Sequence, residues 1–476
     1  MEISERREEQ AKLSKYLMSP KSEFLAVYGR RRVGKTFLIR QFLRDKGVFF
    51  VLTGTKGASK KEQLVKFTQE FNLIFPNAPI TKTLDNWGEA FCHLCAACKR
   101  MDNKQKIILF FDELPWLASP RSNFLSEMEY AWNQHFAWME HILLIVCGSV
   151  ASWIIHKVIY GRGGLYGRVT EEIKLLPFTL SEMEMFLVDH HIALPRRAIV
   201  ELFMVTGGVA KYLTYIDRGK SPAQIINNTC FRLQGPLYSE FHKIYTSHFD
   251  QSERHIKVIR ALAKKRRGMK ADEIIESLDM RRGGTATRII RDLEESGFIS
   301  PLPDFGKEVK EKRYRLTDEY SYFYLQWIEP MRSQITHRSD QDYWNKMINT
   351  PAYYTWSGYT FENICIKHAY EIKRALGLGA VSTTESYFAD QGIEIDLVID
   401  RADNCINICE IKFSNGEFVI DKAYAEQLEK KKRIFQKQTK KAVFLVMITP
   451  YGVKENHHYI QTVDSQLTLD ALFMPK

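Results

Sequence analysis

The chain has 476 residues, of which 45% are hydrophobic and 26% charged, and its formal net charge at pH 7 is +11. This composition is typical of globular domains and excludes a largely disordered or fibrous chain. No apolar run reaches the roughly 18 residues that a membrane-spanning helix needs, the charged N-terminus lacks a secretory apolar stretch, and eight cysteines are too few for a disulfide scaffold. We therefore expect a soluble, cytoplasmic protein without a membrane partner. Its positive charge either favours a polyanion partner or simply keeps it soluble.

Short apolar segments alternate with helical patterns through residue 178. The apolar segments are residues 24–28, 48–52, 107–111, 142–147 and 173–176. Nearly continuous apolar strands separated by helices predict a buried parallel sheet, so residues 1–178 are expected to form an α/β domain. Residues 179–250 have helical periodicity and are expected to form a helical lid on that domain.

A glycine-rich segment between the first apolar strand and the following helix fits the pattern G-x-x-x-x-G-K-[S/T]. It consists of Gly29, Arg30, Arg31, Arg32, Val33, Gly34, Lys35 and Thr36. Such a loop points backbone N–H groups at phosphate oxygens, and the helix N-terminus adds positive potential. Lys35 is expected to reach the β- and γ-phosphates and the Thr36 hydroxyl to bind Mg²⁺. The segment therefore predicts a P-loop, with ATP and Mg²⁺ as cofactors.

Polar residues follow two of the apolar strands. Asp112 and Glu113 end the strand at 107–111, which places them at the sheet end where α/β proteins bind ligands. Asp112 is expected to bind Mg²⁺, and Glu113 to orient and deprotonate the attacking water. Ser149 follows the strand at 142–147. It would either sense the γ-phosphate or cap the next helix.

A second glycine-rich loop at residues 162–168 carries two arginines. Either Arg162 or Arg168 would place a guanidinium on a nucleotide, within one chain or across an interface between copies of the chain. The alternative is a solvated loop. An assembly of identical subunits is therefore one reading of this segment.

The order of these motifs, followed by Thr206-Gly207-Gly208-Val209, resembles the prokaryotic AAA-like ATPases of the STAND-related group. In that family the last motif usually ends in proline, where this chain has Ala210. The resemblance implies a P-loop ATPase followed by a winged helix and by a C-terminal domain similar to PD-(D/E)XK nucleases.

Residues 251–330 change in character, with three short amphipathic helical patterns and a two-stranded hairpin around a polar turn at 303–307. This pattern predicts a winged helix-turn-helix. Thr285, Thr287, Arg288 and Arg291 would face DNA from the third helix, and Lys307, Lys310, Lys312 and Arg313 lie in or beside the wing. A winged helix also serves as a spacer between proteins, and both roles stay open.

Residues 331–357 are expected to be a connector, and residues 358–476 a small α/β domain that resembles a restriction endonuclease. Asp396 lies on one predicted strand, and Glu410 and Lys412 share a face of the next. Two carboxylates would hold Mg²⁺ near a scissile phosphate, and Lys412 would position water or stabilise developing charge. Glu362, on the preceding helix, would complete the metal shell. The set is similar to the D…E-x-K core of PD-(D/E)XK nucleases; ion pairs on a solvated hairpin, or a fold that binds without cutting, are the alternatives.

Two hypotheses follow from these residues. In the first, a Mg²⁺-dependent ATPase controls a C-terminal module that binds or cleaves DNA. In the second, a STAND-like switch changes domain docking with its nucleotide state, and the C-terminal domain is a non-catalytic interaction module.

Overall fold

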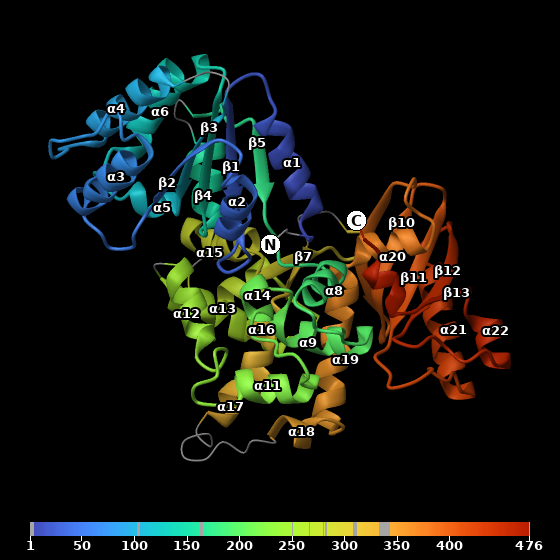
Figure 1. Cartoon of the computed structure of the whole chain (residues 1–476). Helices are drawn as coiled ribbons and strands as arrows, with labels where there is room; N and C mark the ends of the chain where they lie inside the picture. Colours follow the sequence, from blue (N-terminus) through green and yellow to red (C-terminus); the bar gives the residue numbers. More distant parts are fainter. Residues whose placement is uncertain are drawn as a thin grey trace. The chain divides into compact units, whose positions relative to one another are not determined.

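The computed structural model describes residues 4–101, 105–161, 165–249, 251–265, 267–278, 280, 283–307, 312–332 and 343–475. The chain divides into two compact units, Met1–Leu176 and Pro177–Lys476. Figure 1 colours them from blue to cyan-green and from green to red. No helix among the described residues is long and apolar enough to cross a membrane.

A parallel five-stranded sheet forms the centre of the first unit, as the sequence predicts. Its strands are β1 (Glu23–Tyr28), β2 (Val48–Thr53), β3 (Ile107–Asp112), β4 (Ile142–Gly148) and β5 (Glu171–Lys174). Their spatial order is β2-β3-β4-β1-β5. Strand β5 begins two residues before the predicted segment at 173–176, because the polar Glu171 and Glu172 pair with Leu25 and Ala26 of β1.

Helices cover both faces of this sheet (Figure 1). They are α1 (Arg7–Leu17), α2 (Lys35–Leu43), α3 (Lys60–Ile74), α4 (Trp87–Arg100), α5 (Leu114–Leu117), α6 (Phe124–Gln134) and α7 (Ala151–Ile154). Alternate residues of each strand enter separate cores. One core contains residues of α1 and α2, and the other contains residues of α3, α4, α6 and α7. The central strands β1, β3 and β4 therefore read as continuous apolar runs because they are buried on both faces.

The second unit begins with helices in the region predicted to be a lid. They are α8 (Leu180–Asp189), α9 (Arg196–Thr206), α10 (Ala210–Leu213), α11 (Pro222–Cys230) and α12 (Glu240–His248). Three further helices follow, α13 (Ser252–Lys264), α14 (Ala271–Ser277) and α15 (Gly284–Glu295), with a small sheet of β6 (Met269–Lys270), β8 (Arg313–Leu316) and β7 (Ile299–Leu302) in that order. The third strand, β6, is too short to give a signal in the sequence.

The remaining helices before the last sheet are α16 (Glu319–Phe323), α17 (Glu329–Met331), α18 (Tyr343–Met347), α19 (Pro351–Lys367) and α20 (Ala369–Ala375). Residues 331–357 are expected to be a connector. The structure has mostly helix over residues 343–357 of this segment. Trp344, Tyr353 and Trp356 there are buried and contact one another's rings. Aromatic side chains drive this burial although the segment is otherwise polar.

A second five-stranded sheet ends the chain. It contains β9 (Thr383–Asp390), β10 (Ile393–Arg401), β11 (Cys405–Ile411), β12 (Ala442–Ile448) and β13 (Ser465–Leu467), with helices α21 (Lys422–Gln436) and α22 (His457–Thr462). Strands β9, β10 and β11 are antiparallel, whereas β11, β12 and β13 are parallel, in the spatial order β13-β12-β11-β10-β9. The sequence did not reveal β9, because its buried residues do not form an apolar run.

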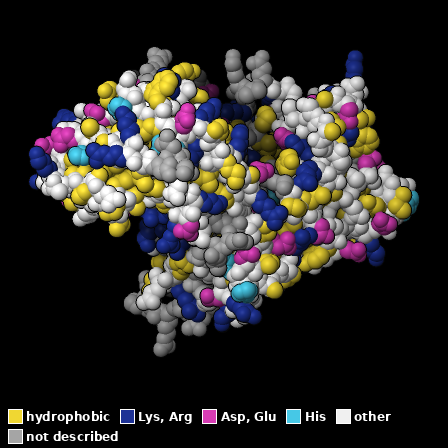
Figure 2. Space-filling view, turned by 45° about the horizontal axis from the view of Figure 1, so that its top comes forward, with side chains coloured by type: hydrophobic (Ala, Val, Ile, Leu, Met, Phe, Trp, Pro, Cys, Tyr) yellow, Lys and Arg dark blue, Asp and Glu magenta, His cyan; other side chains and the backbone are white. Residues whose placement is uncertain are grey.

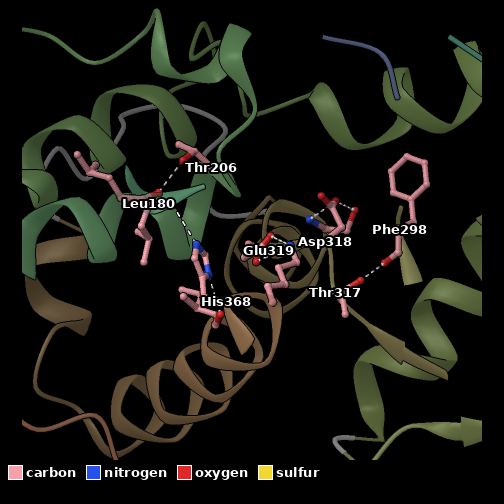
Figure 3. A network of polar contacts seen from close by, with 11 residues as sticks. Leu180, Thr206, Phe298, Thr317, Asp318, Glu319 and His368 are labelled. Carbon is pink, nitrogen blue, oxygen red and sulfur yellow. Dashed lines mark hydrogen bonds and ion pairs between the residues drawn. The ribbon is translucent and has the colours of Figure 1, made fainter. Parts of the chain in front are cut away.

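Polar contacts join the end of helix α19 to the lid helices within the second unit (Figure 3). The Leu180 N–H, at the start of α8, donates to Nε2 of His368 at 3.1 Å. Lys367 Nζ donates to both carboxylate oxygens of Glu319 at 2.7 Å, and Glu319 is buried. A Cβ at Gly207 would lie 2.6 Å from Glu319 Oε2, so the glycine pair after α9 packs directly on this ion pair.

Candidate functional site

The P-loop of the first unit runs from the end of β1 into helix α2. Lys35 Nζ donates to the carbonyl oxygens of Gly29 at 2.8 Å and of Arg30 at 2.9 Å, and Lys35 is buried. The loop thus holds the ammonium group by its own backbone. Gly29 has φ +150°, and a Cβ there would lie 2.1 Å from the Leu175 carbonyl oxygen. Only glycine allows this close approach of two backbone segments.

The Mg²⁺ ligands predicted in this unit lie side by side. Thr36 Oγ1 donates to Asp112 Oδ2 at 2.8 Å, and Asp112 is buried at the end of β3. Magnesium sites commonly combine one or two such oxygens with phosphate oxygens and water. The residues present therefore fit a magnesium ion bound together with a triphosphate.

Glu113 lies next to this pair in an uncommon backbone conformation. Its φ is 49° and its ψ is 49°, and its N–H donates to Asp112 Oδ1 at 3.0 Å. Left-handed conformations of residues other than glycine store strain of about 1–3 kcal/mol and cluster at functional sites. The conformation turns the Glu113 side chain toward β4, where its Oε2 accepts from the Ser149 hydroxyl at 2.9 Å and from the Ser149 N–H at 3.3 Å. Ser149 therefore contacts the carboxylate that was predicted to act on water.

Sequence reasoning missed Arg6. Its guanidinium is buried and donates to the carbonyl oxygens of Val33, at 3.4 Å, and of Leu176, at 2.5 Å. Arg6 thus links the P-loop to the chain that follows β5. In the sequence, Arg6 lies within a charged N-terminal run. In the structure, its backbone is left-handed, with φ 63°.

The remaining side chains of the P-loop differ in exposure. Arg31 is exposed, Arg30 is buried, and Arg32 adopts a left-handed conformation with φ 73° before Gly34. Arg168 is exposed in the turn before β5, outside the hydrogen-bonded set around Lys35. Arg162 lies outside the described residues.

The C-terminal domain brings Asp396, Glu410, Lys412 and Glu362 together from three elements. Asp396 on β10 accepts the Ile411 N–H of β11 through Oδ2 at 2.9 Å. Glu410 is the last residue but one of β11 and is buried, and Lys412 directly follows the strand. Glu362 projects from α19, and its carboxylate interacts electrostatically with Asp396 and Lys412. The predicted grouping of these four residues around one sheet end is what the structure has.

Glu410 is held by three donors. Its Oε1 accepts from the Tyr424 hydroxyl at 2.8 Å and lies 2.9 Å from Lys412 Nζ, and its Oε2 lies 2.6 Å from Lys431 Nζ. Sequence reasoning missed both Tyr424 and Lys431. The heptad-like spacing of these two on α21 would have placed them on one face.

The carboxylates of this cluster differ in acidity. Burial, and secondarily the Asp396 charge, raises the pKa of Glu362 to about 8. Burial, and secondarily Glu410, raises the pKa of Asp396 to about 6. Burial alone would raise the pKa of Glu410 as well, but Lys412 and Lys431 outweigh it and hold this pKa below its ordinary value. Desolvation raises the pKa of a buried acid, and nearby opposite charges lower it.

Metal binding at this cluster requires some rearrangement. Among the described residues, no three His, Cys, Asp or Glu side chains lie close enough together to hold a metal ion. A carboxylate set is nevertheless the chemistry that divalent hard cations prefer. Glu410 would have to turn from its ammonium partners toward Asp396 for the three acids to share one cation.

The helices of residues 251–330 present the side chains predicted for DNA. Thr285, Thr287, Arg288 and Arg291 are exposed on α15, whereas Ile289 and Leu293 are buried. The wing offers less free positive charge. Lys312 lies 3.2 Å from Glu294, and Arg313 lies 3.3 Å from Asp304. Lys307 lies 3.5 Å from Asp304, and Lys310 lies outside the described residues.

Charge on the surface is mixed. On the face seen in Figure 2, Lys and Arg side chains form several separate groups with Asp and Glu side chains between them. The net charge of +11 is therefore not gathered into one continuous patch on this face.

Comparisons with known proteins identify the first part of the chain. Residues 3–216 match a family model described as an ATPase domain predominantly from Archaea. Residues 324–432 match a family model described as archaeal and bacterial proteins of unknown function. A protein of Methanocaldococcus jannaschii, described as uncharacterized, is 24% identical over 435 residues, which are 90% of this chain and 92% of that protein.

Solved structures with similar folds have low identity. The Walker-type ATPase of Pyrococcus abyssi is 18% identical, with a TM-score of 0.47. The matched region covers 68% of this chain and 95% of the Pyrococcus chain. The ORC2 protein of Aeropyrum pernix is 13% identical, with a TM-score of 0.43, and covers 70% of this chain and 94% of that one.

The family match and the geometry around Lys35 together define the class of the first domain. The chain contains an ATP-binding ATPase domain of the P-loop type. The family match extends through helices α8, α9 and α10 to residue 216.

Proposed function

We propose that the protein is a Mg²⁺-dependent ATPase whose nucleotide state controls a C-terminal module that binds and cleaves DNA. The observation that carries the proposal is the convergence of Glu362, Asp396, Glu410 and Lys412 at one end of the last sheet. Buried acids with shifted pKa values beside a lysine are typical of sites that do chemistry.

The ATPase roles follow from the contacts in the first unit. Lys35 would exchange the Gly29 and Arg30 carbonyl oxygens for the β- and γ-phosphate oxygens of ATP. Thr36 and Asp112 would hold Mg²⁺, which neutralises phosphate charge. Glu113 would orient and deprotonate water, and Ser149 would link this carboxylate to the γ-phosphate.

The C-terminal roles resemble those of PD-(D/E)XK nucleases. Asp396, Glu410 and Glu362 would bind the divalent cation, which supplies Lewis-acid stabilisation to a phosphodiester. Lys412 would position the attacking water or stabilise developing negative charge. Helix α15, whose exposed Arg288 and Arg291 face away from its core, would hold the duplex as the recognition helix of a winged helix.

The contacts at the end of α19 support control of this module by nucleotide. Helix α19 carries Glu362, and its last turn is fixed by Lys367 on Glu319 and by His368 on the Leu180 N–H (Figure 3). Gly207, which follows α9 in the glycine motif noted above, packs on Glu319. A shift of the lid helices would therefore move the helix that holds one of the acids.

Two variants test the proposal separately. Purified wild-type protein is incubated with linear, circular, single-stranded and double-stranded DNA, ATP, and Mg²⁺ or Mn²⁺. Lys412→Ala should abolish metal-dependent cleavage while ATP hydrolysis continues, and exposed Lys430→Ala is the matched control. Lys35→Ala should abolish ATP binding. Absence of cleavage by the wild type under all these conditions would refute the nuclease role.

One observation favours a second candidate, a STAND-like switch with a non-catalytic C-terminal domain. Every oxygen of Glu410 already has a cationic or hydroxyl partner, as in a structural ion pair. In this case Arg168, exposed before β5, would reach the nucleotide of a second copy of the chain. ATP-dependent assembly that Arg168→Ala abolishes, without any DNA cleavage, would establish the switch.

A further inference from the structure

Arg315 enters the C-terminal carboxylate cluster from a strand that precedes it. Along β8, Tyr314 and Leu316 point into the core formed with helices α13, α14 and α15. Successive side chains of a strand alternate, so Arg315 points the other way. It contacts helix α19, where its Cζ lies 5.3 Å from the Tyr359 ring centroid, and only 5% of Arg315 is exposed.

The backbone around Arg315 is shaped to admit its side chain. Gly268, with φ +75°, passes close to β8, and a Cβ there would lie 3.0 Å from Arg315 Cγ and 2.6 Å from the Tyr314 carbonyl oxygen. The long stem of the arginine is therefore packed tightly. Its guanidinium is held in place near Glu362.

The guanidinium has few acceptors. The nearest carboxylate oxygen, Glu362 Oε2, is 3.8 Å from Arg315 Nη2, which is longer than a hydrogen bond. Among the described residues, the buried Nε has no hydrogen-bond partner. Because a buried N–H donor of a charged group without a partner is costly, this arrangement favours an additional acceptor at the guanidinium.

We propose that Arg315 binds a non-bridging phosphate oxygen of a phosphodiester held at the Asp396, Glu410 and Lys412 cluster. This inference rests on the proposed nuclease-like function of that cluster and extends it to a residue outside the C-terminal domain. The planar guanidinium donates two parallel hydrogen bonds to phosphate, a geometry that a lysine does not reproduce. The substrate site is then composite, with the phosphate clamp supplied by the segment of residues 251–330.

Arg267 provides a matched control. It comes from the same segment, and it pairs with Glu394 on β10, two residues before Asp396. Arg267 is 61% exposed, and Glu394 also accepts from the Tyr387 hydroxyl at 2.9 Å. The Arg267–Glu394 pair is thus exposed, and Glu394 has a second donor. Removing the Arg267 side chain changes the net charge without removing a buried donor.

The test uses the full chain and a fluorescein-labelled tetranucleotide, whose length limits the number of phosphates it presents. Anisotropy gives its affinity, with Lys412→Ala in all samples to prevent cleavage. Arg315→Ala should weaken binding at least about tenfold, the effect of one charge-assisted hydrogen bond. Arg315→Lys should recover part of the lost affinity, and the affinity of Arg267→Ala should stay within about twofold of that of its parent. Arg315→Lys carries the test if the alanine variant does not fold.

Several outcomes would overturn the proposal. These are no measurable binding by the parent, an Arg315→Ala affinity within twofold of the parent, or equal losses for Arg267→Ala and Arg315→Ala. Cleavage is assayed separately in the chain with Lys412 intact. Arg315-dependent binding without any cleavage would refute the nuclease role and leave the phosphate site established.

Discussion

The two candidate sites stabilise their charged residues by different partners. In the ATPase domain, backbone carbonyl oxygens accept from Lys35, and neutral hydroxyl groups donate to Asp112 and Glu113. In the C-terminal domain, the ammonium groups of Lys412 and Lys431 contact Glu410.

This difference has a physical consequence. Neutral partners are easily exchanged for phosphate and metal, because no buried charge is left unpaired when they leave. Breaking an ion pair leaves a buried charge behind and is more costly. The first site is therefore ready for ligand exchange, whereas the second is stable until a ligand of matching charge enters. Four predictions test the comparison, from the largest expected effect to the smallest.

The largest effect is expected for Gly29→Ala. The added Cβ would lie 2.1 Å from the Leu175 carbonyl oxygen, so the loop would have to move away. ATP binding should be lost, and the free energy of unfolding should fall by about 3 kcal/mol or more. Gly57→Ala is the control, since Gly57 also has a positive φ, of +77°, but nothing lies within 4 Å of its added Cβ. Equal ATP affinity of the two variants would contradict the role of this contact.

Glu113→Gln should separate ATP binding from hydrolysis. The amide keeps the size of the carboxylate but cannot accept a proton, so we expect ATP binding to remain and the hydrolysis rate to fall about 100-fold. Ser149→Ala should have a smaller effect because it removes only the hydroxyl contact. Exposed Glu70→Gln is the control. Unchanged turnover in Glu113→Gln would assign the water to another residue.

In the C-terminal domain, Tyr424→Phe removes one neutral donor from Glu410 and leaves its ammonium partners. The free energy of unfolding, measured in urea, should fall by about 1.5 kcal/mol, the value of a hydrogen bond to a charged group. Half-exposed Tyr370→Phe should change it by much less. A loss for Tyr424→Phe no greater than for the control would show that the ammonium groups alone fix Glu410.

Burial of a carboxylate in the second unit should also appear as a pH dependence. Burial raises the pKa of Glu319 above its ordinary value, although Lys367 opposes the shift. The folded chain then keeps the proton to higher pH than the unfolded chain, so this group lowers stability as pH rises above 4.5.

Glu319→Gln removes this titration. The melting temperature of the variant minus that of the wild type should therefore be higher at pH 8 than at pH 5. A difference of the opposite sign would contradict the buried position of the carboxylate.

The grouping of residues in the first candidate site could be expected from the sequence because the signals are local. Lys35 and Thr36 lie in one contiguous loop, and Asp112 ends an apolar strand. The parallel sheet could be expected for the same reason, since β1, β3 and β4 are buried along their whole length and read as apolar runs. These signals require no knowledge of distant contacts.

The second site was predicted only in part, because tertiary contacts complete it. The E-x-K spacing of Glu410 and Lys412 is local, but Tyr424 and Lys431 reach Glu410 from a later helix. The alternation along β8 shows that Arg315 points away from its own core. It does not show that α19 lies there, because that contact forms between distant segments.

The hairpin after β7 has a final consequence for the last sheet. The Phe305 N–H donates to the Tyr387 carbonyl oxygen at 2.8 Å, the Tyr387 N–H donates to Pro303 at 2.9 Å, and the Phe305 ring lies 4.8 Å from that of Phe435. Strand β9 is the outer strand of that sheet, and an uncovered edge recruits strands from other chains. The hairpin therefore protects the protein against edge-to-edge aggregation, and fragments cut before β9 would lose that protection.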